Sequence, residues 1–177
     1  MKADYGKLAT TLVVGGYLLN AALRPETGHF IDGANLMFHE AGHLIFSFCP
    51  EWITIAAGSG LQTALPLAIA AYAVAKRQYF TAAVVLMWVG QTLTNTSVYA
   101  GDALTMRLDL IGGDGTTHDW NHLLWRFGLL HHATAIGMIF RYAGIATVVC
   151  GLALSIRLSF IRPAGPERTR LDVSPTE

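Results

Sequence analysis

Residues 39–43 read His-Glu-Ala-Gly-His and lie inside an apolar stretch, residues 30–48. On a helix, His39 and His43 are four positions apart and share one face, so both imidazoles can bind the same metal ion. Glu40 is next to His39 and can take a proton from an attacking water molecule. The pattern therefore predicts a zinc hydrolase site, with His39 and His43 as metal ligands and Glu40 as the catalytic base.

A catalytic zinc ion takes three protein ligands and leaves one position open, so the histidine pair needs a partner from elsewhere in the chain. His118 is the first candidate, because residues 118–122 repeat the His-acid-x-x-His form of the first motif. Asp102 is the second, because it ends an apolar run where an unpaired carboxylate would be costly. His122 and Asp119 are alternatives, and Asp119 can instead orient an imidazole. We expect zinc here, with iron as the alternative ion.

The composition indicates a membrane protein. Hydrophobic residues make up 53% of the 177 positions, charged residues make up 14%, and the mean hydropathy is +0.42. A soluble domain of this length with solvated faces would be less apolar. The formal net charge is zero and no basic stripe is present, which excludes a nucleic-acid-binding protein. Cys49 and Cys150 form no CxxC pair, so neither a thiolate metal site nor a disulfide framework is expected.

Four apolar runs predict the fold class, an all-α, multi-pass integral membrane bundle with re-entrant or interfacial helices in addition. The runs are residues 8–23, 61–75, 79–100 and 142–161. Residues 1–162 are expected to form a single membrane-embedded helical domain. Residues 163–177 are expected to form a polar, flexible cytoplasmic tail.

Basic residues predict how this bundle lies in the membrane. They fall at the N-terminus, between the second and third runs and after the fourth run, positions that share one side when four helices cross. These residues are Lys2, Lys7, Lys76, Arg77, Arg157, Arg162, Arg168 and Arg170. The positive-inside rule places this side in the cytoplasm, so we expect a bacterial inner-membrane protein with both termini cytoplasmic.

The segments expected on the opposite side, residues 24–60 and 101–141, hold all seven histidines. The metal site is therefore expected near the extracytoplasmic face. The lipid bilayer is the expected partner, and a membrane protein or peptide is the expected substrate.

Local signals predict how the two histidine motifs are presented. Pro50 and the sequence Gly58-Ser59-Gly60 predict turns, so residues 30–60 are expected to dip into the membrane and return. In the second motif, Thr116 or Thr117 is expected to cap the helix that carries the histidines. Gln91, Thr94 and Asn95 share one helical face and are expected to form interhelical hydrogen bonds.

Three motifs together resemble a group of small, multi-pass bacterial membrane proteins with no assigned activity. They are His39-Glu40-Ala41-Gly42-His43, Tyr99-Ala100-Gly101-Asp102-Ala103 and His118-Asp119-Trp120, and the likeness covers most of residues 30–130. The resemblance implies a helical membrane fold and a metal site.

More distantly, an HExxH helix in a membrane is similar to that of site-2 proteases, which are intramembrane zinc peptidases. This resemblance implies that His39 and His43 bind zinc and that Glu40 acts as general base. Site-2 proteases take their third ligand from an Asp-Gly motif in a later membrane helix. The nearest match here, Asp114-Gly115, lies in a glycine-rich loop, and no inserted soluble substrate-binding domain is present.

Two other functions are compatible with the same residues. A membrane di-metal oxidase or oxygenase would bind iron through histidine pairs at 39/43, 118/122 and 131/132, although the HxxHH groups of membrane desaturases are absent. A metal-stabilised accessory subunit of a membrane complex would instead hold a closed site of four protein ligands, with histidines 39, 43, 118 and 122. The number of ligands around the ion distinguishes these hypotheses.

Overall fold

The computed structural model describes residues 3–108 and 118–161. Its α-helices are α1 (Tyr5–Thr10), α2 (Gly16–Leu23), α3 (Phe30–Ile45), α4 (Glu51–Ala75), α5 (Tyr79–Asp102), α6 (Asp119–Arg126) and α7 (Ala133–Ser159). A π-helical segment, η1 (Thr11–Gly15), joins α1 to α2, and the 3-10 turns η2 (Pro25–Thr27) and η3 (Leu130–His132) precede α3 and α7. The all-helical prediction is confirmed for the described residues. The predicted tail, residues 163–177, lies outside them.

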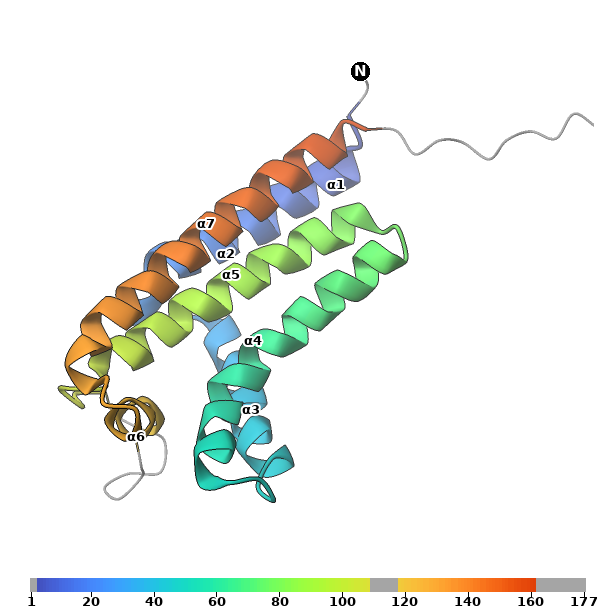
Figure 1. Cartoon of the computed structure of the whole chain (residues 1–177). Helices are drawn as coiled ribbons and strands as arrows, with labels where there is room; N and C mark the ends of the chain where they lie inside the picture. The colour runs from blue at the N-terminus through green and yellow to red at the C-terminus, as the bar shows by residue number, and fades with distance from the viewer. Residues whose placement is uncertain (1–2, 109–117, 162–177) are drawn as a thin grey trace, which may run out of the picture.

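The helices form two packed groups (Figure 1). Helices α1, α2, α5 and α7 and the second half of α4 run side by side, while α3 and the first half of α4 form a hairpin that projects from this group. The backbone N–H of Asp4 donates to the carbonyl of Ser159 at 2.8 Å, so the chain start lies against the end of α7. Helix α6 lies at the opposite end, next to the start of α7 (Figure 1).

Within residues 3–108 and 118–161, two helical stretches are long and apolar enough to cross a membrane, Glu51–Ala75 and Leu130–Ser159. Both extend further toward the chain start than the apolar runs predicted from the sequence. Helix α5 is nearly as long as α4 but carries a set of buried polar side chains that make it less apolar, Gln91, Thr92, Thr94, Thr96 and Ser97. The first predicted run lies in one continuous helical stretch, α1 followed by η1 and α2, which is not among the candidate spans.

The predicted turn at Gly58-Ser59-Gly60 is wrong, because all three residues lie within α4. Glycine in a helix interior costs about 1 kcal/mol relative to alanine, so the sequence alone favours a break there. Packing outweighs this cost, because Gly58 is buried against the histidines of α3. The predicted break at Pro50 is confirmed, since α4 begins directly after it.

A chain of side-chain amides holds α3 against α4 and α5. Asn35 donates to Gln91 at 2.7 Å, while Gln91 and Asn95 donate to one carboxylate oxygen of Asp32 at 2.8 and 3.1 Å. Gln62 of α4 donates to Asn95 at 2.8 Å. The predicted interhelical bonding is confirmed for Gln91 and Asn95 but is wrong for Thr94, whose hydroxyl donates to the Gln91 carbonyl within α5. Because these groups are satisfied, the network fixes the orientation of the α3 face that also carries the two histidines.

Candidate metal centre

His39, His43 and Asp119 converge at one point, and we call them the ligand triad. Asp119 Oδ2 lies 2.8 Å from His39 Nε2 and 3.1 Å from His43 Nε2. One ligand atom from each residue lies within 4.8 Å of the other two. His39 and Asp119 are buried and His43 is partly buried. Two imidazoles and one carboxylate at this spacing form a group that could hold a metal ion.

Two glycines make room for the triad. A Cβ at Gly58 would lie 2.6 Å from His43 Nε2 and 2.7 Å from His39 Nε2, so only glycine leaves space for both nitrogens. A Cβ at Gly42 would collide with the backbone carbonyl group of Ala57. Gly42 therefore lets α3 cross α4 at close range, and this crossing brings the histidines over Gly58. The donor types and this space therefore suit a metal ion held by both imidazoles and the carboxylate.

Hydrogen bonding leaves the metal-facing nitrogen of His43 available as a ligand. His43 Nδ1 donates to the carbonyl oxygen of Thr54 at 2.9 Å, because a carbonyl can only accept. The lone pair of the neutral ring is therefore on Nε2, which faces Asp119. In the metal-free protein the hydrogen bond with Asp119 raises the pKa of His43 to about 9, against the opposing effect of burial. Burial raises the pKa of Asp119, but its bonds with both imidazoles outweigh this and lower it.

Binding of a divalent metal ion at the triad is expected to release about one proton per site at pH 7. His43 carries an extra proton below its pKa of about 9 in the metal-free protein, and a ligand imidazole must be neutral. Metal affinity should therefore fall by about tenfold for each pH unit below 9. Calorimetry in buffers of different ionisation enthalpy measures the released proton. Identical heats in all buffers would contradict this assignment of the proton.

His118 and Asp102 form a separate pair. The backbone N–H of Asn121 donates to His118 Nδ1 at 3.2 Å, so Nε2 of the neutral ring carries the hydrogen and has no lone pair for a metal. This Nε2 lies 3.7 Å from Asp102 Oδ2 and has no hydrogen-bond partner among the described residues. Burial lowers the pKa of His118, which favours the neutral ring.

Asp102 and His118 each have a local structural role. The carboxylate of Asp102 accepts from the backbone amides of Arg107 and Leu108 and from the hydroxyl of Thr105, just after the end of α5. His118 is the N-cap of α6. The expected capping residues, Thr116 and Thr117, lie outside the described residues, as does the Asp114-Gly115 sequence.

Tyr99 lies between the triad and His118. Its ring centroid is 5.9 Å from that of His39 and 4.4 Å from that of His118. The backbone N–H of Asp119 donates to the Tyr99 hydroxyl at 3.0 Å. This bond satisfies one of the free amides at the start of α6 and fixes the position of the residue that faces both histidines.

Glu40 and His122 are not members of the triad. Glu40 is exposed on α3, and its charge contributes to the raised pKa of His43, which places the carboxylate within electrostatic range of the site. His122 Nε2 lies 3.9 Å from Glu51 at the start of α4. Glu40 is thus an exposed acid whose charge reaches the site, whereas His122 contacts a carboxylate outside the triad.

The structure thus brings together His39 and His43, two of the predicted ligands, and does not add His118 or Asp102 to them. Asp119, which the sequence left as an alternative, lies against both imidazoles instead. Asp119 is the acidic residue of the second His-acid-x-x-His motif, and this position was the feature of the sequence that could have indicated a ligand. The sequence did not indicate the roles of Gly58, Gly42 and Tyr99, because each depends on a contact between helices that are distant along the chain.

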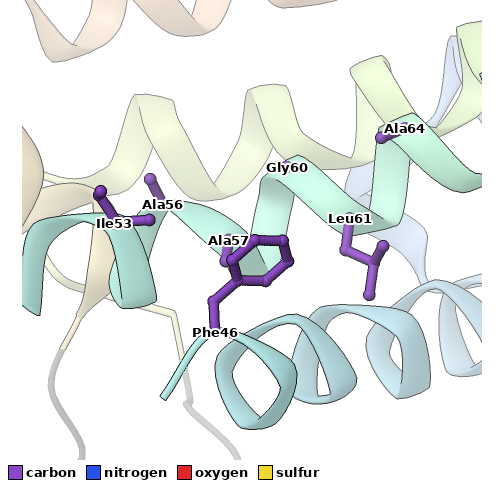
Figure 2. A pocket seen from close by; sticks show the side chains of 7 residues that line it. All are labelled: Phe46, Ile53, Ala56, Ala57, Gly60, Leu61 and Ala64. Carbon is purple, nitrogen blue, oxygen red and sulfur yellow. The ribbon is translucent and has the colours of Figure 1, made fainter. Parts of the chain in front are cut away.

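An apolar hollow of about 330 Å³ lies beside the hairpin, between the end of α3 and α4 (Figure 2). It is lined by Phe46, Ile53, Ala56, Ala57, Gly60, Leu61 and Ala64. None of these side chains titrates or binds a metal, and no member of the triad lines the hollow. The chemistry of the described residues is therefore concentrated at the triad.

The chain matches no protein-family model, and it shows no significant similarity to any curated protein or solved structure. The resemblances drawn from its motifs therefore stay predictions.

Proposed function

We propose that this chain is a membrane-embedded, zinc-dependent hydrolase of the peptidase type. The observation that carries the proposal is the convergence of both histidines of the HExxH pattern with a carboxylate from a distant helix. Gly58 adds the space that an ion needs. A carboxylate as third ligand also agrees with the similarity to site-2 proteases, in which an Asp from a later helix has this role.

In this proposal each residue near the triad has a defined task. A bound zinc ion would supply Lewis acidity, polarising the scissile carbonyl and making water a stronger acid. His39, His43 and Asp119 hold the site, and Thr54 orients the His43 ring. Glu40 takes the proton of the attacking water and returns it to the leaving amine.

The three-ligand geometry favours this proposal over the two alternatives. A closed structural site with four histidines would need His118 and His122, but His118 faces Asp102 and His122 faces Glu51. A di-metal oxidase would need a second group of ligands, and within residues 3–108 and 118–161 the triad is the single group of this kind. A lone iron(II) ion also accepts two histidines and one carboxylate, so elemental analysis must accompany any assay.

The same proposal includes a multi-pass arrangement in a bacterial inner membrane. Lys7, Arg77 and Leu158 line one surface hollow, so the chain start, the α4–α5 turn and the end of α7 share one end of the bundle. The triad contacts Tyr99, near the far end of the 24-residue helix α5. This helix is roughly 36 Å long. Basic residues at one end and the triad at the other support cytoplasmic termini and an extracytoplasmic site.

Replacing Asp119 tests the proposed ligand set. Asp119→Ala should lose stoichiometric zinc, because the two imidazoles alone supply one ligand fewer than a catalytic zinc site needs, and should lose zinc-dependent cleavage of quenched-fluorescent peptides. His122→Ala is the control within the same helix and should keep both. The measurement is metal content after dialysis, together with the cleavage rate in lipid nanodiscs. Zinc retained by Asp119→Ala but lost by His122→Ala would overturn the assignment.

A further inference from the structure

The outward side of α6 and the turn after it carry a group of exposed apolar side chains, Trp125, Phe127 and Leu129, which we call the outer cluster. Their exposed fractions are 70%, 57% and 42%. The inward side of α6 is packed, with Leu124 in a buried cluster that includes Ala133 at the start of α7. This short segment is therefore apolar on both sides, and most of its outward side, Trp125 above all, is uncovered.

The position of α6 indicates which partner would cover this side. Trp120 Nε1 donates to Ser59 Oγ of α4 at 3.1 Å, and the ring of Phe127 packs edge-on against Trp52 near the start of α4, with centroids 6.2 Å apart. The stretch Leu130–Ser159 begins almost directly after α6. Helix α6 therefore lies beside the starts of the two stretches that are long and apolar enough to cross a membrane, where a bilayer would have its surface.

We propose that the outer cluster inserts into the headgroup region of a lipid bilayer and thereby holds Asp119 over the two histidines. Tryptophan and phenylalanine side chains are favoured at this depth. The exposed side chains of Arg126, His131 and His132 supply donors for lipid phosphates in the same segment. This inference rests on the proposed metal centre.

The coupling follows from how the triad is built. His39 and His43 come from α3, which the amide network ties to α4 and α5. Asp119 comes from α6, a helix of eight residues that also carries Trp125. A helix this short moves as one rigid piece, so any contact that steadies Trp125 also steadies the carboxylate. Metal affinity should therefore depend on the membrane surface.

The lipid contact is tested by tryptophan fluorescence in nanodiscs made with lipids brominated near the headgroup. The wild-type chain should lose more emission than Trp125→Leu, because Trp125 would lie among the brominated carbons. Equal quenching of the two proteins would overturn the contact. So would protection of Trp125 that appears only when a soluble protein is added, because the partner would then be a protein.

The coupling is tested with Co²⁺ as the probe, titrated into chains in nanodiscs. Trp125→Ser should weaken Co²⁺ binding by about tenfold, the lower end of the loss seen when groups that support a metal ligand are removed. Trp125→Phe should restore it. Tyr72→Ser is the matched control, since Tyr72 is 64% exposed on α4 and lies far from α6 along the chain. Unchanged affinity in Trp125→Ser would overturn the coupling.

The fluorescence and Co²⁺ measurements together show whether a failure lies in this inference or in the proposed function. A wild-type chain that binds no Co²⁺ would contradict the metal centre and the coupling together, while the quenching difference would still decide the lipid contact. Co²⁺ binding that is equal in Trp125→Ser and the wild type would contradict the coupling alone.

Discussion

Glu40→Gln is expected to keep zinc bound and to lower the rate of peptide cleavage by about 1,000-fold. The amide has nearly the shape of the carboxylate but cannot accept a proton from water. Glu40 is outside the ligand triad and exposed, so its replacement leaves the positions of His39, His43 and Asp119 unchanged. The measurements are zinc content and the cleavage rate of a quenched-fluorescent peptide at saturating zinc.

Two control variants distinguish loss of the base from loss of the metal ion. His43→Ala should lose both zinc and cleavage, because it removes a ligand. Glu51→Gln, which changes another exposed acid on the neighbouring helix, should keep both. Full activity in Glu40→Gln would show that a different group takes the proton, and loss of zinc in this variant would show that Glu40 is a ligand.

Gly58→Ala is expected to lower zinc affinity by roughly 100-fold. The new methyl group would lie 2.6 Å from His43 Nε2 and 2.7 Å from His39 Nε2, closer than such atoms can approach. Both rings would have to turn away, and the site would lose the alignment of two of its three donors. Relief by a backbone shift is limited, because Gly42 and Ala57 already hold α3 and α4 in tight contact.

Gly60→Ala is the matched control for this substitution. It adds the same methyl group to the same helix, but no atom lies within 4 Å of the added carbon. Alanine is also the better helix former, so this variant should be as stable as the wild type or more so, with unchanged zinc affinity. Competition with a zinc-sensitive dye gives both affinities. Equal affinities in the two glycine variants would contradict the position assigned to the ion.

The sequence predicted the helical class and the pairing of His39 with His43, because both depend on local spacing along one helix. It also predicted the break at Pro50, which directly precedes the first residue of α4, a position where the missing N–H of proline is tolerated. The interior of α4 was not predictable in this way. Gly58 and Gly60 carry a turn signal, and this signal is overcome by packing against α3, which no local pattern contains.

The third member of the triad illustrates the same limit. His118 and Asp119 are neighbours, and the sequence favoured the imidazole because its motif repeats the first one. The two side chains point in different directions at the start of α6. The imidazole of His118 accepts a hydrogen bond from the backbone of Asn121, and the carboxylate of Asp119 points toward α3. Which of two adjacent side chains faces a distant helix depends on the docking of α6 against Tyr99, and this docking is set by tertiary contacts.

The close crossing of α3 and α4 has a practical use in comparing distant sequences. Histidine motifs of five residues occur often by chance, whereas this crossing also demands a small residue just before the second histidine and another in the following helix, opposite the rings. A search that requires both glycines as well as an Asp at the start of a later helix would reject most accidental matches. Chains that pass it should share the hairpin even where their remaining helices have diverged.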